Sequence, residues 1–194
     1  MTVQAQAPAL SASICITPCE LDQARAFRSN VFRSRRNIGF DAGLERRRDA
    51  DAIMVIVVRH AGRLVATLRT TAFPCVRSTI TPRPELDELG VDSEVGRLAA
   101  VADPSRARFA LTAMVLGAMW MRDFSSHRTY VAHAHPYLID SYRAVGAFDT
   151  GLRQQVAGRD TDYRLVVGSY ADCARMGMEL LGLAEYQAGD LLKR

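Results

Sequence analysis

The chain has 194 residues, of which 48% are hydrophobic and 24% charged, and this composition is typical of one globular domain with a sizeable core. No apolar run approaches the roughly 20 residues that a membrane-spanning helix needs, and the start of the chain lacks the basic and apolar stretches of a secretion signal. We expect a loose tail, rich in Ala, Gln and Ser, over residues 1–12, and a single cytoplasmic domain over residues 13–194.

The cysteines give no sign of a metal site or of a disulfide framework. They are widely scattered, at Cys15, Cys19, Cys75 and Cys173. The spacing of Cys15 and Cys19 would suit zinc only with a second Cys or His pair nearby, and the sequence has none. Free thiols in a reducing compartment are therefore expected.

The net charge of +4 is carried by arginine, because Lys193 is the only lysine. Many of these arginines crowd the first quarter of the chain: Arg25, Arg28, Arg33, Arg35, Arg36, Arg46, Arg47 and Arg48. Such a cluster is either a solvated face or a docking site for an acidic partner or a phosphate, which arginine binds bidentately. No aromatic residues interleave with it and no nucleic-acid module accompanies it, so we expect no nucleic-acid partner.

The first predicted elements are a strand and a helix. Residues 13–16 favour a short strand. Thr17 then provides a helix N-cap, Pro18 suits the first turn, and Glu20 completes a capping box. Apolar residues at helical spacing continue this helix to about Arg35.

The next predicted unit is a β-hairpin. Residues 37–52 are polar and are expected to form a loop or short irregular helices. Two apolar, β-branched runs, 53–59 and 64–73, flank a turn at 60–63 and predict a pair of antiparallel strands. Residues 74–92, with several prolines, are expected to make a long excursion.

Helices and strands then alternate, which predicts an α/β domain with a central mixed sheet. The expected strands are 94–101, 128–134, a strand at Phe148, and 163–169. Three helices are expected. The first starts at Asp103-Pro104, the second runs from His135 through Tyr142 and is ended by Gly146, and the third spans residues 173–184.

Charged residues stand where simple core strands would carry none. Arg69 lies at the end of the hairpin, and Glu94 and Arg97 lie three residues apart on the next strand. Buried charge is costly unless it is paired. We therefore expect these charges to pair with one another or to face a cleft.

The order of these elements and of a set of residues along them resembles a known family. The set is Arg28-x-x-x-Phe32 in the first helix, Arg69 in the hairpin, Glu94-x-x-Arg97 in the next strand, and Tyr142-x-x-x-Gly146-x-Phe148. Over about residues 14–170 the chain resembles the GCN5-related N-acyltransferase (GNAT) fold. Within that fold it resembles the acyl-homoserine-lactone synthases and N-acyl amino acid synthases, which use acyl carrier protein. The resemblance implies a single GNAT-like domain.

Some positions depart from the autoinducer-synthase pattern. Residues 38–40 replace a Trp after the first helix, and Arg46, Arg47 and Arg48 interrupt an acidic cluster of which Asp49 and Asp51 remain. That cluster serves S-adenosylmethionine in the family, so the departure favours another amine. Residues 106–110 lack the glycines of an acetyl-CoA-binding turn. A helix N-terminus there can still hold a phosphate. We therefore expect Arg106 and Arg108 to help to bind the phosphopantetheine arm of the donor.

Acyl transfer from a thioester to an amine needs a proton acceptor, an oxyanion site and a way for the thiolate to leave. Glu94 is the candidate base or orients a water base, and its alternative is an ion pair with Arg97 or Arg69. Tyr142 is the candidate acid for the leaving thiolate, or else an ordinary amphipathic helix residue. Arg69 and Arg97 are expected to anchor a substrate carboxylate or to hold Glu94.

The remaining candidates are assigned more coarsely. Arg28 and Phe32 are expected substrate-binding residues by the resemblance. His133 and His135 share one face of a strand. A metal site there lacks a third ligand. Two alternatives remain: one of the histidines assists as a base, or His135 is a helix cap or a packing residue.

The sequence thus predicts a cytoplasmic N-acyltransferase that moves a fatty acyl group from acyl carrier protein, or from acyl-CoA, to the amine of a small metabolite such as an amino acid. No bound cofactor is expected, since the acyl donor is a co-substrate. Three alternatives stay open: a homoserine-lactone synthase that uses S-adenosylmethionine, an acetyl-CoA-dependent acetyltransferase, and a non-catalytic domain that binds acyl carriers.

Overall fold

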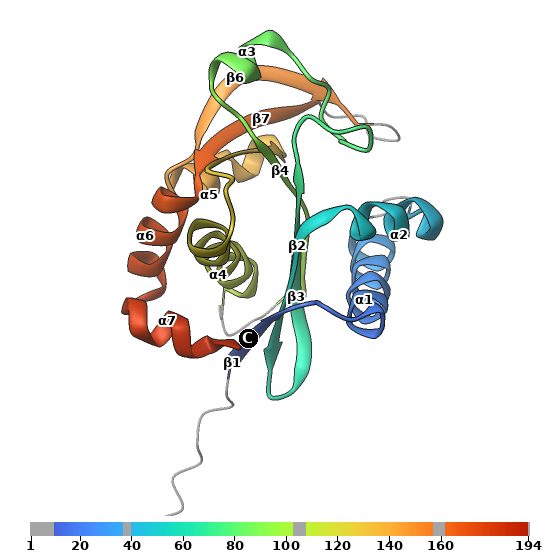
Figure 1. Ribbon diagram of the computed structural model, residues 1–194, viewed down its shortest axis with the longest axis vertical. Coiled ribbons are helices and arrows are strands. Elements are labelled where there is room, and N and C mark those ends of the chain that lie inside the picture. Colours follow the sequence, from blue (N-terminus) through green and yellow to red (C-terminus); the bar gives the residue numbers. More distant parts are fainter. Residues whose placement is uncertain (1–9, 37–39, 103–107, 157–161, 194) are drawn as a thin grey trace, which may run out of the picture.

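A mixed β-sheet runs through the molecule with helices on both faces (Figure 1). The structure, a computed structural model, describes residues 10–36, 40–102, 108–156 and 162–193. The strands are β1 (Leu10–Ile14), β2 (Ala52–His60), β3 (Arg63–Ala72), β4 (Ser93–Ala100), β5 (Thr129–Ala134), β6 (Phe148–Gln155), β7 (Asp162–Ser169) and β8 (Leu192–Lys193). They lie in the order β6-β7-β5-β4-β3-β2-β1-β8.

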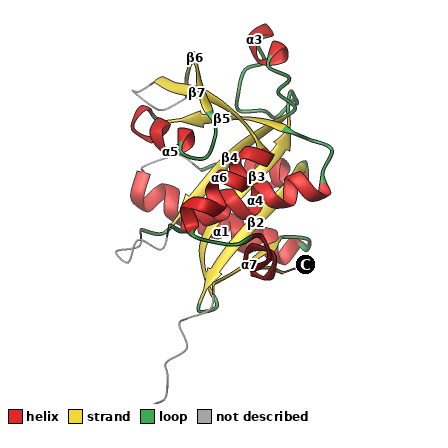
Figure 2. Cartoon of the chain, turned by 90° about the vertical axis from the view of Figure 1, so that its left-hand side faces the viewer, coloured by secondary structure: helices red, strands yellow, loops and turns green. Residues whose placement is uncertain are grey.

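The helices form one layer on each side of this sheet. They are α1 (Pro18–Arg36), α2 (Ala42–Ala50), α3 (Pro84–Glu88), α4 (Phe109–Phe124), α5 (Ile139–Arg143), α6 (Tyr170–Leu181) and α7 (Glu185–Leu191), with a 3₁₀ turn at Pro136–Leu138. Helices α4, α6 and α7 cover one face and α1 and α2 the other (Figures 1 and 2). This confirms the predicted α/β class with a central mixed sheet. No helix within the described ranges is both long and apolar enough to cross a membrane.

Two predictions made from local sequence are confirmed in detail. The Glu20 carboxylate accepts the backbone N–H of Thr17 at 2.9 Å, and the Thr17 hydroxyl accepts that of Glu20 at 3.2 Å, which is the expected capping box. Strands β2 and β3 pair antiparallel up to His60 and Arg63. Ala61 and Gly62 form the turn between them with positive φ angles, and a Gly tolerates this conformation best.

The N-terminal part of the fold differs from the prediction at two places. Strand β1 begins at Leu10 rather than Ser13, because its backbone pairs with both β2 and β8 and this pairing buries Ala12. Residues 42–50, expected as a loop or irregular helices, form one regular helix. Asp41 caps it by accepting the backbone N–H of Leu44 at 2.9 Å.

The predicted helices of the second half also shift. The described part of α4 begins at Phe109, and the predicted start at Asp103-Pro104 lies outside the described residues. Helix α6 begins at Tyr170, three residues before the predicted Cys173, because Ser169 caps it by accepting the backbone N–H of Asp172 at 3.0 Å. It ends at Gly182, whose φ of 67° is left-handed.

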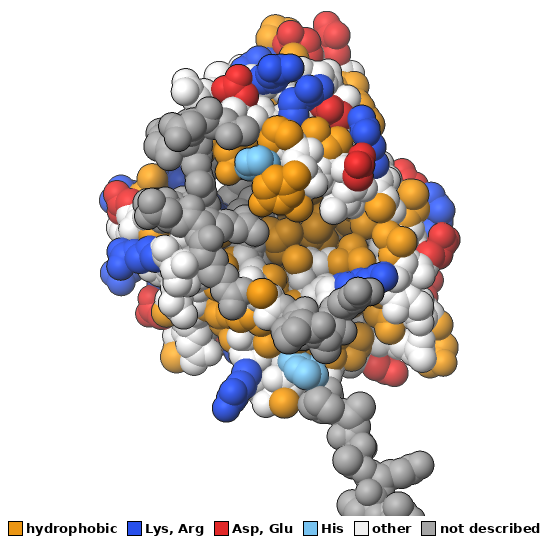
Figure 3. All heavy atoms as spheres, turned by 180° about the vertical axis from the view of Figure 1, so that it is seen from behind, with side chains coloured by type: hydrophobic (Ala, Val, Ile, Leu, Met, Phe, Trp, Pro, Cys, Tyr) orange, Lys and Arg blue, Asp and Glu red, His pale blue; other side chains and the backbone are white. Residues whose placement is uncertain are grey.

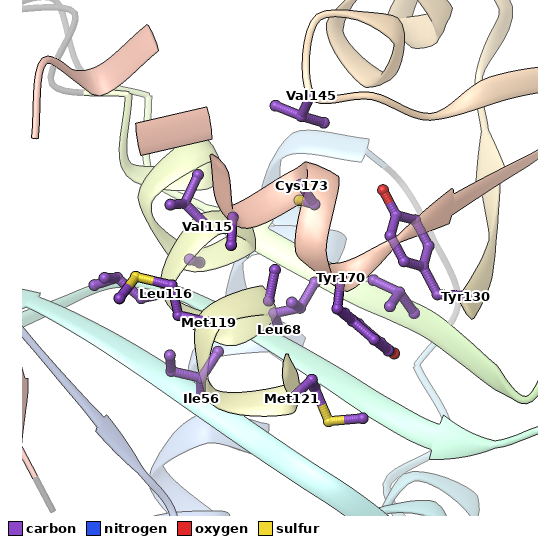
Figure 4. Packing of buried hydrophobic residues seen from close by; sticks show 14 of the residues in the cluster. Ile56, Leu68, Val115, Leu116, Met119, Met121, Tyr130, Val145, Tyr170 and Cys173 are labelled. Atoms are coloured by element: carbon purple, nitrogen blue, oxygen red, sulfur yellow. The ribbon is translucent and has the colours of Figure 1, made fainter. Parts of the chain in front are cut away.

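The core between the sheet and α4 is almost entirely apolar (Figure 4). Helix α4 lays Leu116 and Met119 over Ile56 and Leu68 of the hairpin strands, and all four side chains are buried. Helix α6 packs against α4 on the other side. This layer holds β3, β4 and β5 in position at the centre of the sheet.

Candidate active site

The sheet opens between the neighbouring strands β5 and β4. Strands β4 and β5 are parallel and pair at only three positions, from Ser93↔Tyr130 to Val95↔Ala132. Beyond them, β4 continues along β3 and β5 along β7. The strands therefore lose their mutual hydrogen bonds in the middle of the sheet, and backbone groups there are left to bind something else.

A β-bulge lies on β4 at this opening. The register with β3 jumps from Thr67↔Ala99 to Arg69↔Gly96, so that Arg97 and its neighbour Leu98 face a single residue of β3. Arg97 has a φ of 55°, an unusual value for a residue with a side chain. In a regular strand, residues three apart point to opposite faces. The bulge instead turns Arg97 toward α1 and α2.

The face of the sheet covered by α1 and α2 buries a network of charged side chains. The Arg69 guanidinium donates to Glu45 at 2.9 Å and to Asp49 at 3.2 Å. Arg97 donates to Glu45 at 2.7 Å, and Arg28 donates to Asp49 at 2.5 Å. The predicted arginines thus converge, as expected for charges beside a core, but their partners lie on α2 and not on β4.

Three guanidinium groups share two carboxylates within this charge network, which we define as Arg28, Glu45, Asp49, Arg69 and Arg97. Arg28 is fully buried, yet its Nε and Nη1 atoms have no hydrogen-bond partner among the described residues. Burial lowers the pKa of the Arg28 guanidinium, and Asp49 only partly offsets this effect. The charge network is therefore short of negative charge.

The Glu45 carboxylate stays ionised because Arg69 and Arg97 lie against it. Burial raises the pKa of the Glu45 carboxyl. The charges of Arg69 and Arg97 together lower this pKa by more, so the pKa lies below its ordinary value. Phe32, a predicted binding residue, is buried and lies under the Arg97 guanidinium at 5.7 Å from the ring centroid. This cation–π contact fixes the arginine's position.

Glu94 is not paired with an arginine in the described structure. Its Oε2 atom accepts from the Ser78 hydroxyl at 2.8 Å, from the Thr79 backbone N–H at 2.9 Å and from that of Ile80 at 3.4 Å. Its Oε1 atom accepts from the Thr79 hydroxyl. The expected ion pair of Glu94 with Arg97 or Arg69 is therefore wrong, because both arginines are occupied by Glu45.

Space remains beside Glu94 on the same face. An added Cβ at Gly96 would meet only the Glu94 Oε1 atom, at 3.7 Å, among the described atoms beyond its chain neighbours. Since Val95 pairs with Ala132, the next residues along the diverging strands are Gly96 and His133. The absence of a side chain at Gly96 thus leaves an opening between Glu94 and His133.

A small, mostly apolar pocket lies on the opposite face, under α4 and α6. Its lining residues come from β3, β4, β5, α4 and α6, and they are Leu68, Thr70, Val95, Met114, Gly117, Ala118, Tyr130, Tyr170 and Cys173. Figure 4 shows Tyr130 and Tyr170 side by side there. The Tyr170 hydroxyl lies 2.6 Å from that of Ser93, and burial raises the pKa of the Cys173 thiol to about 12, so that it stays protonated.

Tyr142, the predicted acid, and Arg108, one of the predicted phosphate-binding residues, lie on the side of this pocket. Tyr142 on α5 is buried in the same core. Burial raises the pKa of Tyr130, and Tyr142 is near enough to Tyr130 to raise that pKa further. Arg108 caps α4 and donates to the Leu180 carbonyl at 2.5 Å. Arg106 lies outside the described residues. The rear face of the molecule has hydrophobic side chains gathered in a central hollow (Figure 3).

Sequence reasoning missed Glu45, which binds three arginines, Arg48, Arg69 and Arg97. A signal was present, because Glu45 and Asp49 are four residues apart and share one face of a helix. That signal depends on reading residues 42–50 as a helix. In the described part of the chain, no group of His, Cys, Asp and Glu side chains is arranged to hold a metal ion, and the four cysteines are free.

Among the comparisons with known proteins, only the comparison with solved structures gives matches to this chain. No family model and no curated protein matches the chain. FeeM, an N-acyl amino acid synthase from uncultured soil microbes, matches with a TM-score of 0.69 at 12% identity, over 90% of this chain and 98% of that chain.

Other acyltransferases of known structure match as well. BjaI, a CoA-dependent acyl-homoserine lactone synthase, matches with a TM-score of 0.65 at 12% identity, over 95% of this chain and 93% of that chain. A putative N-acetyltransferase from Lactobacillus plantarum matches with a TM-score of 0.57 at 18% identity, over 84% and 99%. At these identities the likeness is one of fold. The chain therefore has the GCN5-related N-acyltransferase fold.

Proposed function

We propose that the protein is an N-acyltransferase that moves a fatty acyl group from cytoplasmic acyl carrier protein, or less readily from acyl-CoA, to the amine of an amino acid. One observation carries this proposal. The sheet opens between β4 and β5, with an apolar pocket on one face and a buried charge network on the other. A thioester in the opening would meet an acyl-binding side and an amine-binding side.

The charge network supports a substrate that carries a carboxylate. Its arginines outnumber its carboxylates, and Arg97 is partly exposed at the bulge, on the face that also carries Glu94. An amino acid could therefore place its carboxylate near Arg97 and Arg69. Phe32 supports the Arg97 guanidinium from behind, and Arg28 adds positive charge through its pair with Asp49. Its amine would then reach the opening at Gly96, where the Glu94 Oε1 atom orients it.

The other face offers an apolar lining for the acyl group. Its pocket has a volume of about 10 Å³, room for one water molecule, so a long acyl chain would have to displace the side chains that line it. The pocket is lined by Leu68, Val95 and Met114, and burial of each methylene in such surroundings is worth about 0.8 kcal/mol. Backbone N–H groups freed where β4 leaves β5 are suited to stabilise the oxyanion. In this proposal Tyr142 protonates the leaving thiolate, and Arg108, with Arg106, binds the phosphate of the phosphopantetheine arm.

The test is an assay of the purified protein with each combination of donor and amine. The donors are acyl carrier proteins and CoA loaded with acetyl to long-chain groups, and the amines are the amino acids and S-adenosylmethionine. Thiol release and mass spectrometry of the products give the readout. We expect an N-acyl amino acid from a long-chain donor.

The other outcomes separate the alternatives. A lactone product from S-adenosylmethionine would identify a homoserine-lactone synthase, the activity that BjaI's name states for that protein. Turnover with acetyl-CoA alone would contradict the fatty acyl donor. Binding of acyl carrier protein without any turnover would leave a non-catalytic domain.

A further inference from the structure

His133 lies where β5 has separated from β4 and pairs only with β7. It follows Ala132, the last residue of β5 that pairs with β4. It lies on the face of Val131, which pairs with Glu94, and therefore on the face of the charge network and not on that of the apolar pocket. Its ring is thus beside the opening at Gly96.

We propose that the His133 imidazole accepts the proton that the attacking amine loses when the amide bond forms. The proposal rests on the acyl-transfer function proposed above and names its proton acceptor. The His133 Nε2 atom is buried and has no hydrogen-bond partner among the described residues. A buried ring nitrogen without a partner is unfavourable, and a substrate N–H in the opening would satisfy it.

Glu94 is less suited to that task, although it lies in the same opening. Three donors from residues 78–80 occupy its Oε2 atom, and a fourth occupies one lone pair of Oε1. One acceptor position is left, which can hold and orient an amine. Protonation of Glu94 would break bonds that fix this loop. His133 can take a proton without such a loss.

The protonation state of His133 agrees with the role of an acceptor. Burial lowers the pKa of His133 below its ordinary value, and Glu94 and Gln154 beside it raise the pKa by less. Arg97 lowers it further. Tyr163 meets the ring edge-on at 6.0 Å between centroids. The ring is therefore neutral near pH 7, as a base must be.

The step balances without any further reagent. The amine nitrogen attacks the thioester carbon, the C–N bond forms, and the nitrogen becomes acidic. His133 takes one proton from it, and collapse of the tetrahedral intermediate breaks the C–S bond. The thiolate takes a proton from water, or from Tyr142, which regains one from solvent, and His133 later returns its proton to solvent. The products are an amide and a thiol.

The experiment measures the pH dependence of kcat/KM for wild type and His133→Gln between about pH 5 and 8. We expect wild-type activity to rise with pH through the pKa of His133. The variant should lose this rise and about 10²-fold in kcat, with an unchanged melting curve and partial rescue by added imidazole. A titration of the His133 resonance by NMR in the wild-type protein must give the same pKa as the activity profile.

The matched control is His135→Gln. His135 lies two residues further along the chain, just after the end of β5, and its ring packs on Tyr137 at 4.2 Å between centroids. This variant should keep the wild-type profile. His133→Asn is the second variant if His133→Gln does not fold, and the NMR titration of wild type is independent of both.

Each remaining outcome overturns a defined statement. An unchanged pH profile in His133→Gln, or a His133 pKa that differs from that of the profile, rejects His133 as the acceptor and leaves the acyltransferase intact. Loss of the rise in His135→Gln instead moves the role to that residue. Absence of turnover in wild type with every donor and amine rejects the proposed function, and the proton acceptor with it.

Discussion

The two faces of the sheet are built on opposite principles. Helices α4 and α6 cover theirs with apolar side chains, such as Leu116 and Met119, that interlock with the hairpin strands. Helices α1 and α2 cover the other face partly with small apolar clusters, such as that of Val31, Phe32 and Ala99, and partly with guanidinium and carboxylate groups that are almost as deeply buried. Apolar burial stabilises wherever it occurs, whereas a buried ion pair rarely improves on apolar packing.

The comparison indicates that the charged face is kept for what it positions rather than for stability. Its arginines outnumber its carboxylates, and it reaches the opening at the β4 bulge through Arg97. Changes on this face should therefore affect both folding and activity, while changes on the α4 face should act mainly through packing. The predictions below test that distinction.

The largest effect is expected at Asp49, which contacts Arg25, Arg28 and Arg69. Asp49→Ala leaves buried arginines without a partner, and this should lower the free energy of unfolding by about 3–5 kcal/mol. Urea denaturation followed by circular dichroism measures it. The control is Asp51→Ala, which breaks an exposed pair with Arg77 and should cost less than about 1 kcal/mol. Equal losses in the two variants would contradict a buried network.

The next effect concerns Glu94, which the sequence suggested as a base, as the group that orients a water base, or as an ion-pair partner of Arg97 or Arg69. Glu94→Gln should lower kcat/KM on the order of 10²-fold, because the amide neither attracts the amine nor raises the pKa of His133. It also presents an N–H₂ group to donors from residues 78–80, so the melting temperature should fall too.

A matched variant separates these two contributions of Glu94. Thr79→Val removes one hydroxyl from the carboxylate without changing its charge. It should lower the melting temperature slightly and keep most of the activity. If Thr79→Val loses as much activity as Glu94→Gln, the carboxylate acts by holding the loop and has no direct part in acyl transfer.

The apolar face offers a test of packing without charge. A Cβ at Gly177 on α6 would overlap with the buried Val115 side chain on α4. Gly177→Ala should cost about 1–3 kcal/mol by overpacking. Val115→Ala should relieve this overlap, so a double-mutant cycle should show favourable coupling of about 0.5–3 kcal/mol. Additive losses would mean that the two helices shift apart freely.

What the sequence predicted correctly was mostly local in origin. The capping box of Thr17 and Glu20 and the hairpin turn at Gly62 depend on residues a few positions apart, and both are present. That the Arg69 charge is paired follows from the cost of unpaired buried charge, although its partners are Glu45 and Asp49 and not Glu94. These inferences need no knowledge of how distant segments meet.

What it missed depends on contacts between distant segments. The face to which Arg97 points is decided by a bulge relative to β3, and a bulge leaves no mark in an apolar run. The Glu94 carboxylate is bound by a loop that precedes it by about 15 residues in the chain. Glu45 was overlooked because the polar residues around it suggested an exposed loop. The segment is instead a helix, in which Arg46 and Arg47 are exposed and Glu45 is buried.

The smallest effect is expected from the exposed arginines of α2. The sequence suggested that acidic carrier protein docks on the arginine-rich first quarter, and of those residues Arg46 and Arg47 are exposed on α2. This helix covers the sheet face opposite the apolar pocket (Figure 1). Reversing both charges to Glu should therefore raise the apparent KM for acyl carrier protein by no more than a few-fold, and added salt should reduce the difference.

The donor and the comparison variant decide how that result is read. Acyl-pantetheine has no acidic surface, so its turnover should not change. Arg143 and Arg175, exposed on α5 and α6 near Tyr142 and Cys173, provide the matched reversal on the pocket side. A larger rise in KM from that pair would locate carrier docking on the pocket side, since the phosphopantetheine arm would then enter beside its own binding face. A rise in KM from the reversal of Arg46 and Arg47 alone would instead indicate that carrier protein docks on the charged face and that its phosphopantetheine arm passes between β4 and β5. No rise from either pair would remove the electrostatic support for a carrier protein and favour acyl-CoA as the donor.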